Sequence, residues 1–541
     1  MKKIKHIAEN YGISEENLIN YGDFKAKLSY DFMSKQADKS GKLILVTAIN
    51  PTPLGEGKTT ITIGLGDALN LCGNKTAIAV REPSLGPTFG VKGGAIGGGL
   101  AKVVPEDDIN LHFTGDIHAI TSANNLLCAM IDNSLHQGNP LKIDSNQVMI
   151  KRCLDMNDRA LRRITIGRGD DSNGVEREDS FQLSVACEIM ATLCLAENFT
   201  DLENRLENIL VAYSTDGAPI FSKDLKVTGA LMALLKDAFL PNIVQTLAGT
   251  LALVHGGPFA NIAHGANSLI ATKTALNIAD FVVTEAGFGS DLGFEKFMNI
   301  KCRKSGLKPA AVVLVATLRA LKYNAGVARG EVSEPNKTAL QGGLANLSAH
   351  IENIKNFNLP CVVAINRFAE DLENEIKIVT DFCKKSDVEV GLTDIFSKGG
   401  AGGTDLAEKV ITASENPSNI ALTYNDDDSI EDKILKIAQK VYGAKTVEYS
   451  DLALQNLEKI KALNIKNYPI CMAKTPYSLS DNPTLLNRPS GFTVLVSDIY
   501  PRMAAGFLVV ICGNILDMPG LPKNPSAENI CVENGAIIGI T

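Results

Sequence analysis

A stretch near the N-terminus combines residue types that bind phosphate. It runs through Thr52, Pro53, Leu54, Gly55, Glu56, Gly57, Lys58 and Thr59, and is called the predicted P-loop below. Glycines at 55 and 57 let backbone N–H groups turn toward phosphate oxygens, and the helix expected to follow adds its dipole. Lys58 is expected to reach the β- and γ-phosphates, and the Thr59 hydroxyl to face Mg²⁺. Thr52 replaces the usual first glycine, so a glycine-rich turn without a ligand is the alternative.

Arg81 and Glu82 open a second, glycine-rich segment that extends to residue 99. Its sequence, REPSLGPTFGVKGGAIGGG, contains too many glycines for a packed element and is typical of backbone that approaches a ligand. Both charged residues follow a predicted strand, at the edge where open α/β sheets bind ligands. An arginine there can hold a carboxylate or an acyl phosphate through two hydrogen bonds. A structural Arg–Glu pair is the alternative.

Asp116 and His118 lie in a third segment, FTGDIHAITSANNLL, at a turn just before a predicted helix. Such positions suit groups that transfer protons or organise a metal. Capping of the helix is the alternative role for Asp116.

The elements that must position these residues alternate between short apolar runs and longer helical ones. Buried strands are predicted at residues 43–48, 76–80, 281–284, 311–316 and 361–365, and helices at residues 59–72 and 181–197. The strands are apolar on nearly every residue, as in a parallel sheet covered on both faces. The pattern therefore predicts an α/β fold: a P-loop-containing, doubly wound, mostly parallel sheet domain with two smaller α/β domains.

The bulk properties exclude several classes of protein. The chain has 541 residues, of which 45% are hydrophobic and 21% charged, and a net charge of -8. This charge offers no general attraction for a nucleic-acid backbone, so no nucleic-acid partner is expected. The eleven cysteines include no C-x-x-C pair and are expected to be reduced core residues. No secretory signal or membrane-length apolar run is present, which predicts a cytoplasmic protein without a membrane partner.

Together, the three motif segments resemble the signature segments of the formate–tetrahydrofolate ligases. The resemblance continues through residues 255–264, 284–293, 364–368, 398–403, 474–478 and 518–523. It therefore spans almost the whole chain and is far more specific than a P-loop alone.

The resemblance implies an ATP-dependent ligation that serves one-carbon metabolism. ATP and Mg²⁺ would convert formate to formyl phosphate, which tetrahydrofolate attacks to give 10-formyltetrahydrofolate, ADP and phosphate. Lys58 and Arg81 would neutralise charge in the first step, with Arg81 holding formate and then formyl phosphate. Asp116 would accept the amine proton or orient the amine in the second step, with Glu82 as the second candidate. A homotetramer and a monovalent cation, K⁺ or NH₄⁺, are also implied.

Three phenylalanines are expected at the folate and formate sites by the same resemblance. Phe368 and Phe396 match the two positions that stack on the pterin, and Phe288 would line the formate end. The family usually has tryptophan at the position of Phe396, and this chain contains no tryptophan. Residues 1–349 would then form the P-loop domain with the formate site, residues 350–450 a second α/β domain with the folate-stacking residues, and residues 451–541 a C-terminal α/β domain.

Two other functions compete with this interpretation. An ATP-driven switch or partner-binding ATPase would use a similar P-loop, but it needs no aromatic slot for a pterin. A non-catalytic or altered-substrate paralogue would fit the departures at Phe396 and at residues 498–506, although Lys58, Thr59, Arg81 and Asp116 are all present.

Overall fold

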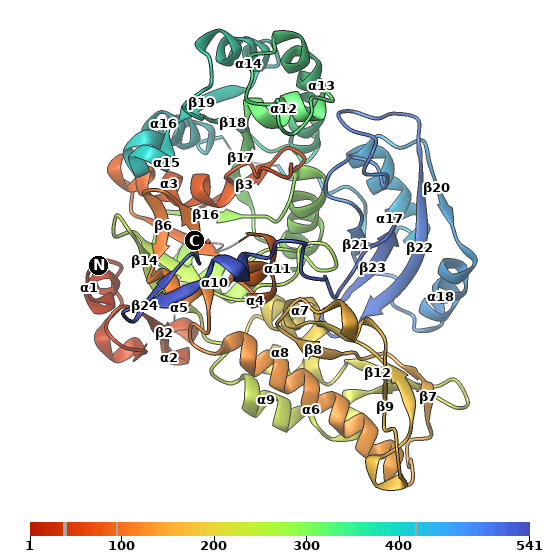
Figure 1. Cartoon of the computed structure of the whole chain (residues 1–541). Coiled ribbons are helices and arrows are strands. Elements are labelled where there is room, and N and C mark those ends of the chain that lie inside the picture. The colour runs from red at the N-terminus through yellow and green to blue at the C-terminus, as the bar shows by residue number, and fades with distance from the viewer. Residues whose placement is uncertain (36–40, 93–95, 417–418, 541) are drawn as a thin grey trace.

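The computed structural model describes residues 1–35, 41–92, 96–416 and 419–540. It has the predicted mixed α/β architecture, built around one large sheet (Figure 1). The strands expected from the sequence are present as β3 (Lys42–Ala48), β4 (Thr76–Val80), β16 (Phe281–Glu285), β17 (Pro309–Ala316) and β18 (Cys361–Asn366). No helix in these described ranges is long and apolar enough to cross a membrane.

The large sheet follows the strand order β1-β2-β14-β15-β4-β16-β3-β17-β18-β19. Neighbouring strands are parallel from β15 (Leu251–Val254) to β19 (Glu389–Thr393). The short strands β1 (Leu18–Asn20) and β2 (Ala26–Leu28) and strand β14 (Asn242–Thr246) extend one side in antiparallel fashion. Because the central strands are parallel, the loops that follow β3, β4 and β16 all emerge at the same edge.

Helices cover both faces of this sheet. Successive side chains of a strand point to opposite faces, so Leu45 and Val46 of β3 enter two different cores. The helices packed on them are α10 (Leu269–Ile278), α13 (Lys337–Lys355) and α14 (Glu373–Lys385) on one face, and α3 (Lys58–Leu71) and α16 (Thr404–Ala413) on the other. Burial on both faces accounts for the continuous apolar sequence of the strands.

A unit formed by residues 116–240 projects from the large sheet (Figure 1). It contains α6 (Asp116–His136), α7 (Glu188–Leu195), α8 (Phe199–Leu206) and α9 (Thr228–Leu235), with β7 (Ile143–Val148), β12 (Leu210–Ser214) and β13 (Pro219–Phe221) forming a small sheet. The helix predicted at residues 181–197 begins only at Glu188. Before it, β11 (Phe181–Leu183) pairs with β8 (Arg152–Leu154), so a tertiary contact overrides the helical pattern.

The C-terminal part of the chain forms a second, smaller α/β unit. Its sheet has the order β20-β22-β23-β21, with β20 (Thr446–Tyr449), β22 (Thr493–Arg502), β23 (Phe507–Cys512) and β21 (Ile470–Ala473). Helices α17 (Ile430–Ile437) and α18 (Asp451–Ala462) pack on it. The large sheet itself continues through β18 and β19, so strands on both sides of the predicted domain boundary at residue 350 belong to one sheet.

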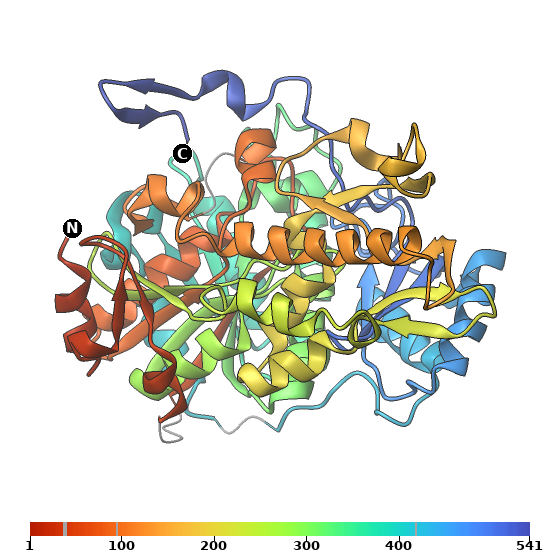
Figure 2. The same ribbon diagram turned by 90° about the horizontal axis from the view of Figure 1, so that it is seen from below.

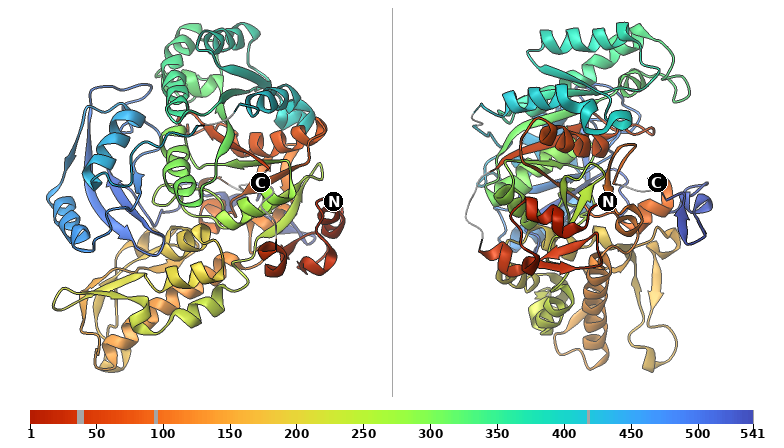
Figure 3. Two further views of the ribbon diagram at one scale, coloured as in Figure 1. Left: turned by 180° about the vertical axis from the view of Figure 1, so that it is seen from behind. Right: turned by 90° about the vertical axis from the view of Figure 1, so that its left-hand side faces the viewer.

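The last residues leave this unit and run across the molecule. Figures 2 and 3 show this tail extending along one side of the body, with its terminal hairpin far from the smaller sheet. It contains a short turn at Ser526–Asn529 and a hairpin of β24 (Cys531–Glu533) and β25 (Ala536–Ile538). Asp517 anchors the start of the tail, because its carbonyl accepts from Leu183 N–H and its carboxylate pairs with Lys151.

Candidate active site

The predicted P-loop lies between β3 and α3 and is held by its own hydrogen bonds. The Thr52 N–H donates to Glu56 Oε1 at 2.7 Å. Gly57, directly before α3, has φ 72°, and a Cβ there would lie 2.4 Å from Asn366 Nδ2. Glycine suits this position for both its conformation and its size. The loop thus brings the start of α3 to the carboxyl edge of the sheet, and such a helix terminus favours anions.

Lys58 crosses to the segment that follows β16. Its Nζ donates to the backbone carbonyl of Phe288 at 2.8 Å. Phe288 has φ 59°, a left-handed conformation that is uncommon for a residue with a side chain. The resemblance implied that Phe288 lines the formate end, and the contact with Lys58 is made by its backbone carbonyl. The lysine expected at the phosphates is therefore held at the junction of the P-loop and the β16 loop.

Thr59 and Arg81 approach the same carboxylate, that of Glu285. The Thr59 hydroxyl donates to Glu285 Oε2 at 2.9 Å. Arg81 Nη2 lies 4.0 Å from Glu285 Oε1. Sequence reasoning missed Glu285 as a site residue, although it lies inside a motif segment and ends a buried strand. Thr59 of the predicted P-loop and Arg81 of the glycine-rich segment therefore both lie beside Glu285, which belongs to neither of these two segments.

Asp116 and Glu82 belong to a buried group of charges that includes Lys27. Lys27 Nζ lies 2.8 Å from Asp116 Oδ1, and both side chains are almost fully buried. Asn242 Nδ2 also donates to Asp116, at 2.8 Å. Burial and the nearby Asp116 raise the pKa of Glu82 well above its ordinary range, while Lys27 opposes this rise. Lys27 lies on the short strand β2, and its local sequence gave no sign of a partner in a distant helix.

The two predicted stacking residues follow neighbouring strands at the same edge of the sheet. Phe368 follows β18, and the Arg319 guanidinium carbon lies 3.9 Å from the centre of its ring. Phe396 lies in α15 (Ile395–Lys398), directly after β19, and is 61% exposed. An exposed ring at this edge is available to a ligand, whereas the Phe368 ring already has a cation on one face.

The glycine-rich segment after Arg81 packs against Phe396. The Leu100 N–H donates to the Phe396 carbonyl at 2.9 Å. A Cβ at Gly98 would lie 3.2 Å from Phe396 Cε2, and one at Gly99 would lie 2.0 Å from its carbonyl oxygen. Gly98 and Gly99 therefore let the backbone approach Phe396, whereas the sequence pattern predicted that glycines of this segment let the backbone approach a ligand. Residues 93–95 of this segment lie outside the described residues.

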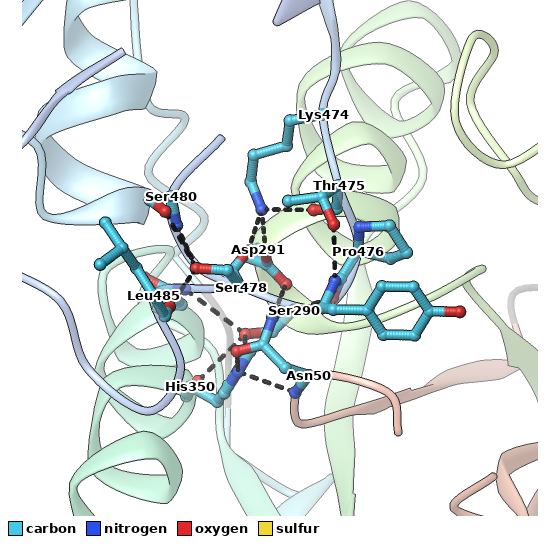
Figure 4. A network of polar contacts seen from close by, with 12 residues as sticks. Asn50, Ser290, Asp291, His350, Lys474, Thr475, Pro476, Ser478, Ser480 and Leu485 are labelled. Atoms are coloured by element: carbon cyan, nitrogen blue, oxygen red, sulfur yellow. Dashed lines mark hydrogen bonds and ion pairs between the residues drawn. The ribbon is translucent and has the colours of Figure 1, made fainter. Parts of the chain in front are cut away.

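A buried polar junction ties the C-terminal unit to the base of the predicted P-loop (Figure 4). Lys474, directly after β21, places its Nζ 2.6 Å from Asp291 Oδ2, and neither side chain is exposed. Asn50, just before the P-loop, donates through Nδ2 to the Pro476 carbonyl at 3.2 Å and to Asp291 Oδ1 at 3.4 Å. The C-terminal unit thereby contacts the backbone that leads into the P-loop.

His350 of α13 completes this junction (Figure 4). His350 Nε2 lies 3.0 Å from the Asn50 backbone nitrogen and 2.9 Å from Asn50 Oδ1, so it meets one donor and one acceptor of the same residue. His350 Nδ1 lies 2.7 Å from Ser290 Oγ. Burial lowers the pKa of His350 to about 4, which keeps the ring neutral near pH 7.

The residues near the predicted P-loop can be tested for their fit to the Mg²⁺ that the resemblance implies. Within the described ranges, no group of three or more His, Cys, Asp or Glu side chains is arranged to hold an ion. Mg²⁺ typically keeps several waters and binds through substrate phosphates and one or two protein oxygens. The Thr59 hydroxyl, which donates a hydrogen bond to Glu285, could serve as one protein ligand for an ion that binds together with a nucleotide.

Comparison with known protein families agrees with this arrangement. The sequence model of the formate–tetrahydrofolate ligase family matches residues 1–541, which is the whole chain. The chain therefore belongs to the formate–tetrahydrofolate ligase family, whose members are ATP-dependent ligases.

Proposed function

We propose that this protein joins formate to tetrahydrofolate through formyl phosphate, giving 10-formyltetrahydrofolate, ADP and phosphate. The observation that carries the proposal is the position of Thr59 and Arg81 on one carboxylate, Glu285. A nucleotide at the P-loop and a formate held by Arg81 would meet beside that residue. Family membership indicates which substrates are used. The shared contact with Glu285 supports transfer of phosphate from ATP to formate as the first step.

In the first step, a formate oxygen attacks the γ-phosphorus of ATP and ADP leaves. Formate is already an anion, so the step needs orientation and charge neutralisation and no general base. Lys58 would move from the Phe288 carbonyl to the phosphates, and Arg81 would hold the carboxylate. Mg²⁺ bound with the nucleotide would neutralise charge on the phosphate oxygens.

In the second step, N10 of tetrahydrofolate attacks the formyl carbon, phosphate leaves, and the nitrogen loses a proton. Asp116 is bound by Lys27 and Asn242, which suits a residue that orients the amine. Glu82 Oε2 has no hydrogen-bond partner among the described residues. A buried carboxylate with a raised pKa is a stronger base than an exposed one, so Glu82 also suits the role of proton acceptor.

Phe396 and Phe368 would hold the pterin of tetrahydrofolate. Both emerge at the carboxyl edge of the sheet that carries the P-loop. Aromatic faces bind a flat ring with large contact area and little loss of side-chain freedom. The exposure of Phe396 supports this assignment, because a core phenylalanine would not remain 61% exposed.

The family resemblance adds three further parts to the proposal. They are assembly as a homotetramer, activation by K⁺ or NH₄⁺, and a cytoplasmic location. Light scattering and activity in salts of different monovalent cations would test the first two.

The direct test measures ADP release that depends on both formate and tetrahydrofolate. The product should convert in acid to the methenyl form, with its characteristic absorbance. ATP hydrolysis that proceeds without either substrate, and that changes on binding another protein, would instead support the ATP-driven switch.

An isotope experiment tests the formyl phosphate intermediate separately. Formate labelled with ¹⁸O on both oxygens transfers one of them to phosphorus in the first step. The released phosphate should then carry one ¹⁸O per turnover. Unlabelled phosphate, formed alongside the correct folate product, would exclude the intermediate and retain the overall ligation.

A further inference from the structure

Glu285 lies on the strand between β3, which leads into the predicted P-loop, and β4, which leads to Arg81. It is the last residue of β16, which lies between β3 and β4. In the strand register Glu285 pairs with Val46 of β3, and its neighbour Thr284 pairs with Ala79 of β4. The predicted P-loop follows β3, and Arg81 follows β4. A side chain at the end of β16 therefore lies within reach of both the predicted P-loop and Arg81.

The contact with Thr59 prepares the hydroxyl to face a cation. A threonine hydroxyl has one hydrogen to donate and two lone pairs. Its hydrogen is directed at Glu285 Oε2, at 2.9 Å, so the lone pairs are left for another partner. The Glu285 side chain is 6% exposed, which limits competition from water for this bond.

The contact with Arg81 restrains the guanidinium without occupying its donors. The 4.0 Å between Arg81 Nη2 and Glu285 Oε1 is too long for a hydrogen bond. Opposite charges at this distance in a largely buried place still attract each other. Arg81 is thus held near Glu285 while its N–H groups remain able to bind a carboxylate.

We propose that Glu285 is a positioning residue shared by the nucleotide and formate sites. It directs the Thr59 hydroxyl toward the Mg²⁺ of a bound nucleotide and keeps the Arg81 guanidinium beside the transferred phosphate. The inference rests on the proposed function for its formate half, whereas its metal half requires only that a nucleotide binds at the P-loop.

The test compares metal binding in the parent protein and in Glu285→Gln. Mn²⁺ is titrated into the complex of each protein with ADP, and the free ion is followed by electron paramagnetic resonance. Loss of a residue that orients a metal ligand typically weakens metal affinity about 10–100-fold, and that loss is expected here. Affinity for ADP in the presence of EDTA should stay unchanged, because the proposed role of Glu285 acts on the metal through the Thr59 hydroxyl.

Glu295→Gln is the matched control. Glu295 is also buried, but its Oε1 accepts from Asn299 Nδ2 at 2.6 Å instead of from Thr59. Burial raises the pKa of Glu295 to about 7, so the neutral amide resembles the protonated form that this side chain readily adopts. The control should keep the Mn²⁺ affinity of the parent.

Two results would overturn the metal half of the proposal. One is a Mn²⁺ affinity in Glu285→Gln equal to that of the parent. The other is an equal loss of ADP affinity with and without metal, which would mean that the P-loop itself had deformed. Thr59→Ser and Thr59→Val give a second route, since only the valine variant should reproduce the loss seen in Glu285→Gln.

The formate half is read from steady-state kinetics. Glu285→Gln should lower kcat strongly and change the KM for formate much less, because Arg81 keeps its charge but loses its alignment. A raised KM for formate with normal kcat would overturn this half. The metal titration uses neither formate nor folate, so failure of the proposed ligase activity would leave its outcome readable.

Discussion

Lys474 and Asp291 form an ion pair that is completely buried, with Nζ and Oδ2 2.6 Å apart. It connects the end of β21 in the C-terminal unit to the loop after β16, beside Asn50 at the base of the P-loop. A buried pair contributes little net stability compared with apolar packing, but loss of one partner leaves an uncompensated charge. Substitution of either residue is therefore expected to destabilise the contact between the C-terminal unit and the unit that contains the large sheet.

Lys474→Met should lower the free energy of unfolding by about 3–5 kcal/mol, because Asp291 would remain buried without its partner. Urea unfolding followed by circular dichroism measures the change. Arg488→Met is the control, since it removes an ion pair with Glu352 in which both side chains are more than 40% exposed. Exposed pairs contribute about 0–1 kcal/mol. A Lys474→Met variant as stable as Arg488→Met would contradict the expectation.

Lys58 and Arg81 should serve different substrates. Lys58→Ala is expected to abolish nucleotide-dependent activity, with weaker ATP binding, and to leave tetrahydrofolate binding largely intact, because it removes a phosphate contact. Arg81→Ala should keep ATP affinity and lose formate, because it removes the carboxylate clamp. Calorimetric titration of each ligand into each variant separates the two effects. Loss of ATP affinity in Arg81→Ala, with normal formate affinity, would show the assignment to be wrong.

Phe396 should contribute to tetrahydrofolate binding through its exposed ring. A phenyl ring offers a few tens of Å² less contact area than an indole, which corresponds to about 1 kcal/mol. Phe396→Trp should therefore bind tetrahydrofolate about fivefold more tightly, with ATP affinity unchanged. Phe396→Ala should weaken folate binding by about 1–3 kcal/mol, a typical value for stacking on an aromatic face. Folate affinity in the alanine variant equal to that of the parent would place the pterin elsewhere.

His350 should make the protein less stable in acid. Its pKa is about 4 in the folded state and about 6.5 in the unfolded chain. Between these values the unfolded state binds the proton and the folded state does not, so stability falls as pH decreases from 6.5 to 4. The difference corresponds to about 3 kcal/mol, and it is fully present above pH 6.5.

The measurement for His350 is urea unfolding between pH 4 and pH 8. His350→Gln cannot take up a proton, so its unfolding free energy should fall less than that of the parent on the acid side. His255, whose pKa burial also lowers to about 4, remains in both proteins and contributes equally. Identical pH profiles for the parent and the variant would contradict the assignment to His350.

Much of the fold and part of the site could be predicted from the sequence because they depend on local patterns. Continuous apolar runs identified the strands, such as β17, that are buried on both faces. The glycines around Lys58 predicted a tight turn before a helix, and Gly57 adopts a left-handed conformation directly before α3. The expected helix at residues 59–72 agrees with α3 to within one residue at each end.

The parts that were missed depend on which distant segments become neighbours. Glu285 gains its importance only when β16 inserts between β3 and β4, and no local pattern encodes that order. Lys27 pairs with Asp116 across the fold for the same reason. The glycines at 98 and 99 were noticed, but their neighbour, Phe396, could not be identified from spacing alone.

The strand order also constrains how the chain can be made. Strand β3 has β16 and β17 as its neighbours, and β4 has β15 and β16, so the P-loop strand is synthesised long before any strand that it pairs with. Until residue 285 leaves the ribosome, β3 has no partner strand on either edge, and β4 can pair only with β15. Long-range parallel pairing of this kind is slow and leaves the nascent chain prone to aggregation. Efficient production in the cell should therefore depend on chaperones that shield the first half of the chain.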